Sequence, residues 1–156
     1  QKGNYKNVEF RLGEIEHLPV ADNSADVIIS NCVINLSPDK KQVFFDAYRV
    51  LKLGGRLMVS DIVLEKELPA AIRDSIEAYI GCLSGAVLKN EYLGYIKKSG
   101  FEEIKIVSET YFPLADMAND VTSKAVIDKM GYQPEQIKDL EKIVVSIKVS
   151  AIKPVL

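Results

Sequence analysis

The hydrophobic and polar positions of the chain alternate in some stretches and recur at helical spacing in others, which predicts an α/β fold. Alternating or continuously apolar stretches predict strands at residues 8–15, 25–33, 56–64, 104–112 and 143–152. Apolar residues at helical spacing predict helices at residues 38–51, 69–83, 91–99, 115–130 and 134–141. Strands that alternate with helices over short glycine turns indicate a mostly parallel sheet, whose last two strands we expect to be antiparallel.

Two of the predicted strands and one helix depend on particular residues. Apolar and charged residues alternate from Val8 to Leu12, which is typical of a strand with one buried face. Residues 25–33 (ADVIISNCV) are almost continuously apolar, which is typical of a strand buried on both faces. Ser37 is the expected N-cap of the helix that follows, and the Gly54-Gly55 pair is expected to end it.

The composition is that of an ordinary globular domain. The chain has 156 residues, of which 47% are hydrophobic and 27% charged, and its net charge is −2. Such a charge provides no basic field for a phosphate backbone, and no apolar run reaches the roughly 18 residues that span a bilayer. We therefore expect neither nucleic acid nor a membrane as a partner. Cys32 and Cys82, fifty positions apart, form no disulfide framework, so a cytoplasmic location is expected.

The glycines do not form a nucleotide-binding loop. An open α/β sheet binds its ligand beyond the C-terminal ends of its strands, where a glycine-rich turn lets the backbone approach a nucleotide closely. The Gly54-Gly55 pair instead lies between a helix and a strand, at the other end of the sheet. Periodicity and glycine placement alone therefore predict only part of a doubly wound α/β domain.

Two blocks of sequence resemble class I methyltransferases. Residues 13–36 (GEIEHLPVADNSADVIISNCVINL) and 49–64 (RVLKLGGRLMVSDIVL) are similar to the third, fourth and fifth strands of that Rossmann-like fold, as found in quinone and sterol methyltransferases. Residues 30–40 (SNCVINLSPDK) and 78–87 (AYIGCLSGAV), each with one cysteine, are similar to arsenite methyltransferases. The resemblance covers residues 4–112.

The resemblance also implies how the chain is divided. Residues 1–112 would be the C-terminal part of a methyltransferase core that lacks its first two strands and their glycine-rich cofactor motif. Residues 113–156 would be an extension that carries the last strand of the sheet. In the usual strand order of the class I sheet, the two lacking strands would lie between the strand at 8–15 and the strand at 25–33. We therefore expect either self-association through an exposed sheet edge at 25–33 or a displaced N-terminal segment.

The same resemblance implies S-adenosylmethionine as the cofactor. Glu14 would accept a hydrogen bond from the adenine amino group, Ile15 would pack against the ring, and Asn31 would line the methionine part. Without the resemblance, Glu14 would be interpreted as a solvated turn residue and Asn31 as a capping amide.

The implied substrate is trivalent arsenic, as arsenite or a thiol conjugate, bound by Cys32 and Cys82. Soft thiolates prefer a soft centre, although a free cysteine is more often a small buried hydrophobe. The arsenic lone pair would attack the methyl group, so no general base is needed. We expect His17 to have a structural or cofactor-lining role and Asp61 to cap the segment after its strand.

Two other functions remain open on the sequence. One is methylation of a small organic acceptor such as a quinone precursor, for which His17 or Asp61 would have to serve as the base. The other is an inactive or non-catalytic thiol-binding fragment, because the glycine-rich motif is not in the chain.

Overall fold

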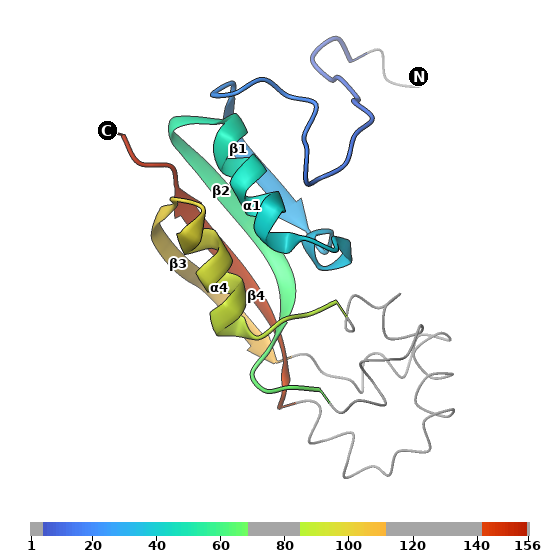
Figure 1. Cartoon of the computed structure of the whole chain (residues 1–156), viewed down its shortest axis with the longest axis vertical. Coiled ribbons are helices and arrows are strands. Elements are labelled where there is room, and N and C mark those ends of the chain that lie inside the picture. The colour runs from blue at the N-terminus through green and yellow to red at the C-terminus, as the bar shows by residue number, and fades with distance from the viewer. Residues whose placement is uncertain (1–4, 69–84, 112–141, 156) are drawn as a thin grey trace.

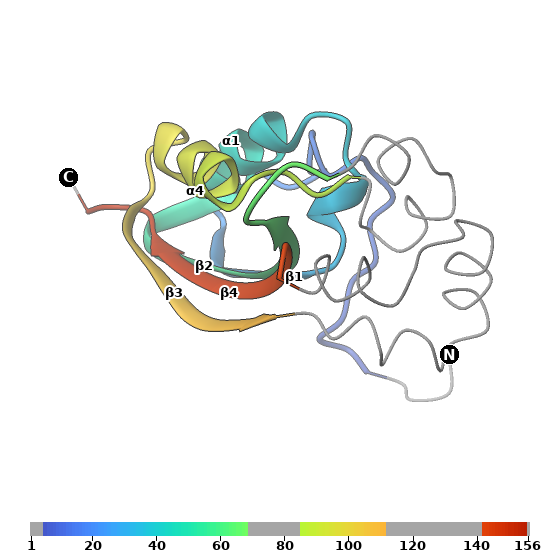
Figure 2. The same ribbon diagram turned by 90° about the horizontal axis from the view of Figure 1, so that it is seen from below.

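A computed structural model describes residues 5–68, 85–111 and 142–155. The helices predicted at 69–83, 115–130 and 134–141 lie outside these residues. The described elements are, in chain order, β1 (Ala25–Asn31), the short 3-10 helix η1 (Ile34–Leu36), α1 (Lys40–Val50), β2 (Leu51–Leu64), α4 (Lys89–Lys98), β3 (Glu102–Tyr111) and β4 (Val144–Ile152). The four strands form one sheet, and both α-helices lie on the same face of it (Figures 1 and 2).

The sheet has the strand order β1-β2-β4-β3. β1 and β2 are parallel, whereas β4 is antiparallel to both β2 and β3. Three strands therefore run in one direction, and β4, inserted between β2 and β3, runs in the other. These directions confirm the predicted α/β fold and its antiparallel C-terminal pair. The division of the chain at residue 112 stays a prediction.

The core lies between the sheet and the two helices. The rings of Phe44 on α1 and Tyr92 on α4 meet edge to face, with 5.2 Å between their centroids. Alternate residues of the two central strands complete this layer, namely Leu57, Val59, Val63, Val145, Ile147 and Val149. The position of α1 and α4 is thus set by apolar residues on one face of each element.

Helix α1 begins two residues later than the sequence predicted. Its N-cap is Asp39, whose Oδ1 accepts the backbone N–H of Gln42 at 2.9 Å. The predicted N-cap, Ser37, is wrong because its hydroxyl has other partners. It accepts the N–H of Asp39 at 3.1 Å and donates to the carboxylate of Glu16, a residue that is distant in sequence.

The end of α1 is capped by a lysine from the C-terminus of the chain. The helix ends at Val50 and β2 begins at once, so the strand is five residues longer than predicted. The ammonium of Lys153 donates to the carbonyl oxygens of Tyr48 and Leu51 and to Oδ1 of Asn23, each at 2.8 Å. A buried cation with three acceptors satisfies carbonyl groups that a helix end leaves free.

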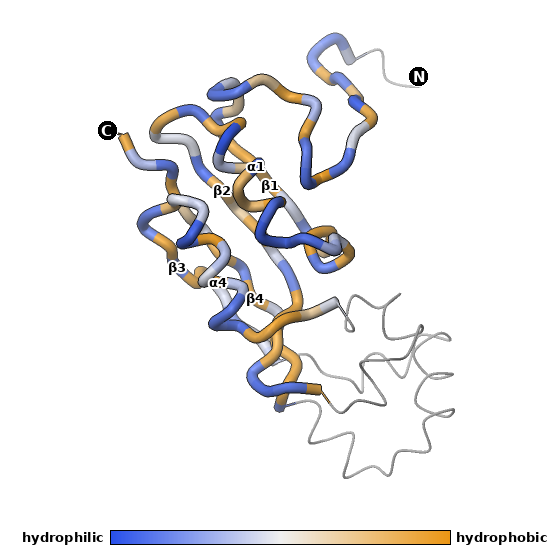
Figure 3. Tube along the Cα trace, in the orientation of Figure 1, coloured by the Kyte–Doolittle hydropathy of each residue, from blue (hydrophilic) through white to orange (hydrophobic). Residues whose placement is uncertain are grey.

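The predicted strand at residues 8–15 is wrong. Val8, Phe10 and Leu12 are all exposed, Leu12 completely so, and residues 8–13 pair with no strand of the described part of the chain. The segment lies beyond the β1 edge of the sheet (Figure 1), although its hydropathy alternates along the tube in Figure 3. Alternation alone does not make a strand, because the backbone groups also need a neighbouring strand to bond.

β1 is not buried on both faces as predicted. It pairs with β2 alone, and its Val27 and Ile29 are 44% and 79% exposed, whereas Ile28 packs against the core under α1. The described residues thus leave one face and one edge of β1 open to solvent.

Among the helices of the described residues, none is long and apolar enough to cross a bilayer.

Candidate functional site

The candidate site lies where β1 ends, at the edge of the sheet where open α/β proteins bind ligands. Cys32 follows the last residue of β1 and has a φ of 56°, in the left-handed region that non-glycine residues seldom adopt. Its backbone N–H donates to the Ser60 carbonyl oxygen at 2.9 Å, and its thiol donates to Asn31 Oδ1 at 3.8 Å. The backbone strain accompanies an exposed thiol at the C-terminal end of a strand, as is common at functional sites.

A cavity of about 280 Å³ lies beside this strand end. Ile15 and Asn31, two of the predicted cofactor residues, both line it, together with apolar side chains from β1, η1 and α1. Its volume is close to the lower limit of roughly 300 Å³ for ligand pockets. Glu14, the third predicted cofactor residue, is exposed in the turn next to Ile15 and is not part of the lining.

Glu14 and Ile15 belong to a closed turn. Glu14 and His17 form an isolated antiparallel bridge, in which the His17 N–H donates to the Glu14 carbonyl oxygen at 3.1 Å. At the base of the turn, Gly13 packs so closely on Pro19 that a Cβ at position 13 would lie 2.6 Å from the proline Cδ. Ile15 is partly buried against the core, which brings this turn to the cavity.

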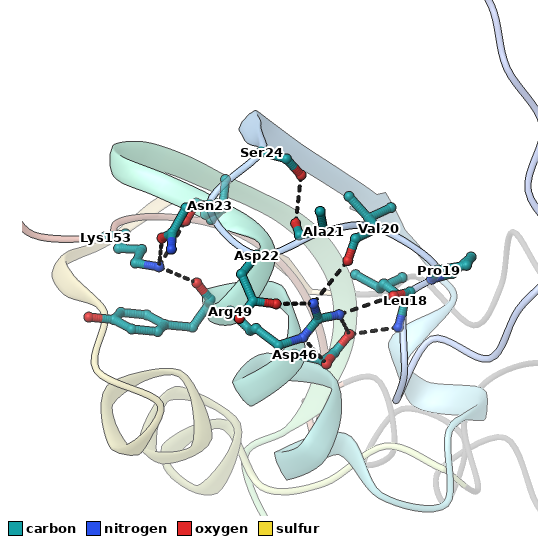
Figure 4. Close-up of polar contacts among 12 residues, drawn as sticks. Leu18, Pro19, Val20, Ala21, Asp22, Asn23, Ser24, Asp46, Arg49 and Lys153 are labelled. Carbon is teal, nitrogen blue, oxygen red and sulfur yellow. Dashed lines mark hydrogen bonds and ion pairs between the residues drawn. The ribbon is translucent and has the colours of Figure 1, made fainter.

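Two charged residues of α1 bind the chain that leaves this turn (Figure 4). The guanidinium of Arg49 donates to both carboxylate oxygens of Asp46, to the carbonyl oxygens of Leu18 and Val20, and to Asp22. Asp46 in turn accepts the Leu18 N–H at 2.6 Å. Burial by itself raises the pKa of the Asp46 carboxyl, but the hydrogen bonds from Arg49 and Leu18 outweigh it and keep the pKa below its usual value.

Asp61 is a buried carboxylate that the sequence did not identify correctly. It lies inside β2, three residues before the end of that strand, so the predicted strand-end cap is wrong. Its Oδ2 accepts the Tyr92 hydroxyl at 2.6 Å, whereas Oδ1 has no hydrogen-bond donor among the described residues. Burial raises its pKa to about 6, against the opposing effects of Tyr92 and the Lys40 charge. The only sequence signal was an acid inside an apolar run.

The charge of Asp61 also acts on the thiol. Partial burial and then the negative charge of Asp61 raise the pKa of Cys32 above its usual value. The Cys32 thiol is therefore protonated at neutral pH when no ligand is bound.

The second cysteine, Cys82, lies outside the described residues. The chain resumes at Gly85, where a Cβ would overlap the carbonyl oxygen of Asn35. Asn35 is buried in η1, and its amide donates to the Ile62 carbonyl oxygen at 2.7 Å. Gly85, three residues after Cys82, therefore packs on η1, which begins two residues after Cys32. Within the described ranges, no three His, Cys, Asp or Glu side chains are grouped as around a metal ion.

The strand order, with an antiparallel strand inserted between β2 and β3, and the cavity at the end of β1 are those of the class I methyltransferase fold. Residues 1–100 match the model of a family described as methyltransferase domain, which is more than half of the chain. The chain therefore belongs to the methyltransferase domain family.

Its relatives include arsenite methyltransferases. The chain is 47% identical over 105 residues to one from Halobacterium salinarum, which covers 67% of this chain and 27% of that protein. It is 40% identical over 130 residues to one from Aquipseudomonas alcaligenes, which covers 81% and 36%. The chain thus spans about a third of the length of these curated relatives.

A solved structure agrees with these relatives. The crystal structure of an arsenic(III) S-adenosylmethionine methyltransferase from Chlamydomonas reinhardtii matches with a TM-score of 0.69 and 32% identity, over 91% of this chain and 43% of that one. Together these similarities confirm the predicted resemblance to arsenite methyltransferases, a class whose solved member named above uses S-adenosylmethionine.

Proposed function

We propose that this protein transfers a methyl group from S-adenosylmethionine to trivalent arsenic bound by the thiols of Cys32 and Cys82. The observation that carries the proposal is the exposed Cys32 thiol, at a strained strand end beside a cavity lined by Ile15 and Asn31. The arsenite methyltransferases among its relatives support arsenic as the acceptor. A cytoplasmic location, where thiols stay reduced, is part of the same proposal.

Cys82 can reach the same site because of its tether to Gly85. Three peptide units join the two residues, and three peptide units span at most about 11 Å. Gly85 packs directly on the backbone of Asn35, which is three residues after Cys32. Fifty positions of sequence therefore do not prevent the two thiols from meeting at one arsenic atom.

The residues around the cavity suit the cofactor. Asn31 offers an amide at the strand end, Ile15 offers an apolar surface to a flat ring, and the exposed carboxylate of Glu14 can accept the amino group of adenine. When bound, S-adenosylmethionine supplies an activated methyl group to the arsenic lone pair.

The protein residues hold the substrate and orient it. As each As–S bond forms, the thiol proton leaves with a hydroxyl group of arsenite as water, so the protonated Cys32 thiol binds arsenic without a net release of protons. Two sulfur ligands leave the lone pair of arsenic free, and their fixed positions direct it toward the methyl donor.

Methylation of an organic acceptor is the alternative, and it would need a base. His17 is exposed on the turn, and Asp61 is enclosed by the core with Tyr92 as its partner. One observation favours Asp61 as this base: its Oδ1 receives no hydrogen bond from the described residues. Analysis of the products formed from labelled cofactor distinguishes a methylated arsenical from a methylated organic acid or phenol.

The thiol site is tested by titrating trivalent arsenic into the full-length protein and into Cys32→Ser, Cys32→Gly and Cys82→Ser variants. We expect the affinity for arsenic to fall at least about tenfold in each variant, because one of two thiolate bonds is lost. Glycine at position 32 also accepts the positive φ, so its loss of binding cannot come from backbone strain.

The matched control is Val33→Ala, which changes the neighbouring exposed side chain and keeps both thiols. Arsenic should bind to this variant as it binds to the wild type. Unchanged affinity in both the Cys32 and the Cys82 variants would show that these thiols are not the arsenic site.

A further inference from the structure

We infer that Asp46 and Arg49 are positioning residues that hold the cofactor-binding turn Glu14–His17 in place and so set the affinity for S-adenosylmethionine. This inference rests on the proposed function, because it takes Glu14 and Ile15 as the residues that meet the adenine. The pair, called here the Asp46–Arg49 clamp, does not itself line the cavity, but it binds the backbone of Leu18, which does.

The clamp binds the chain directly after the turn. Asp46 accepts the N–H of Leu18, and Arg49 donates to the carbonyl oxygen of the same residue at 3.0 Å, so Leu18 is held from both sides of its backbone. Arg49 then reaches the Val20 carbonyl at 2.9 Å and the Asp22 carboxylate at 2.6 Å. Figure 4 shows these contacts converging on one guanidinium.

The contacts of the clamp are strong for physical reasons. Hydrogen bonds with a charged partner are about twice as strong as neutral ones, and a guanidinium that binds both oxygens of a carboxylate has its orientation fixed. The Asp46 side chain is only 7% exposed, so water competes little for it. Because α1 is packed into the core, these bonds fix the irregular loop at residues 18–22 to a rigid element.

The backbone before the turn has little support in the described residues. Residues 8–13 pair with no strand there, and the packing of Gly13 on Pro19 joins the turn only to the loop that the clamp holds. Within the turn, Glu16 is held by its carboxylate, which accepts the Ser37 hydroxyl, and by its carbonyl oxygen, which accepts the Gln42 amide at 3.3 Å. The clamp supplies the contacts on the other side, where the backbone leaves the turn at Leu18.

A loosened turn should weaken cofactor binding without changing the chemical step. If the turn is in place for only a fraction of the time, the apparent dissociation constant rises by the inverse of that fraction. A turn that is in place about a tenth of the time gives a tenfold rise. Once the cofactor is saturating, the turn is held by the ligand and the transfer rate returns to normal.

The test uses the full-length protein with Arg49→Lys and Asp46→Asn substitutions. Calorimetry should show a dissociation constant for S-adenosylmethionine raised about tenfold or more in both variants. The KM for the cofactor should rise in parallel, whereas kcat at saturating cofactor should stay within about twofold of the wild type. Hydrogen exchange at the Leu18 amide should become faster. If Arg49→Lys does not fold, Asp46→Asn still provides the test, because asparagine keeps the shape and one acceptor.

Lys153→Met is the matched control. Lys153 is also a buried cation that binds this loop, but it binds Asn23, which is six residues beyond His17. It should lower thermal stability and leave cofactor affinity unchanged. An equal loss of affinity in this control would make the effect one of general stability and overturn the inference.

The two remaining outcomes separate the inference from the proposed function. If the wild type binds the cofactor and both clamp variants bind it equally well, the clamp has no positioning role and the proposed function still holds. If the wild type does not bind S-adenosylmethionine at all, the proposed function is wrong, and the clamp then has no cofactor affinity to set.

Discussion

At the scale of single residues, Asp61 is a carboxylate in surroundings that favour apolar side chains. It is 1% exposed in a layer of valine and leucine, and burial raises the pKa of its carboxyl from 3.8 to about 6. The folded state thus binds its proton more tightly than the unfolded chain does. The resulting stabilisation is complete below about pH 4 and is lost as the pH rises through about 6.

Replacing Asp61 by asparagine should remove this dependence on pH. Between pH 4 and pH 7 the wild type should lose roughly 2 kcal/mol of unfolding free energy through this one group, and Asp61→Asn should not lose it. Urea denaturation at a series of pH values measures the difference. Asp26→Asn, an exposed residue paired with Lys52, is the control and should follow the wild-type profile. A wild-type profile retained in Asp61→Asn would show that another group titrates.

At the scale of elements, one glycine inside α4 and one just after it have opposite requirements. Gly94 lies in the middle of the helix, and a Cβ there would have no neighbour within 4 Å. Gly100 follows the helix with a φ of 100°, and a Cβ there would lie 3.0 Å from the Tyr48 ring. The first glycine only weakens the helix, whereas the second makes its end possible.

Alanine should therefore have opposite effects at the two positions. Gly94→Ala should stabilise the protein by roughly 0.5–1 kcal/mol, because alanine loses less backbone entropy in a helix. Gly100→Ala should destabilise it by at least about 1 kcal/mol, because an alanine at this φ is strained and meets the ring. Thermal or urea unfolding of the two variants checks this, each serving as the control for the other. A change of the same sign in both would contradict the assignment of the helix end.

At the scale of the whole molecule, the two edges of the described sheet differ. β3 has irregular pairing with β4 and carries charged residues such as Lys105 and Glu109, features that discourage pairing with another chain. β1 carries exposed Val27 and Ile29 and has one charged residue, Asp26, near its start. An apolar edge with a single charged residue near its start favours association.

We therefore predict that the 156-residue chain self-associates through β1. Light scattering after size exclusion should give a mass above that of the monomer, and Ile29→Lys should shift it toward the monomer. Val107→Lys on β3, also at an exposed apolar position, is the matched control and should leave the mass unchanged. A monodisperse monomer of the wild-type chain would contradict this prediction.

The amino-acid sequence by itself determined the kind and order of the described strands and α-helices from residue 25 onward, although not the short 3-10 helix η1. The periodicity of Val43, Phe44 and Ala47 predicted a helix, and the apolar runs predicted strands within one to five residues of their ends. The motif around Cys32 predicted the family. These properties depend on residues that are neighbours in the chain, so a local pattern carries them.

Only the tertiary structure decided which of these local patterns became a paired strand, a cap or a buried group. Val8 to Leu12 alternate like a strand, but no neighbouring strand bonds them. Ser37 looks like an N-cap, but its hydroxyl bonds Glu16. Asp61 looks like a cap at the end of its strand, but Tyr92 and the core enclose it. Each of these outcomes depends on partners twenty or more positions away. Burial and pairing are properties of the packed chain, so no local pattern could carry them.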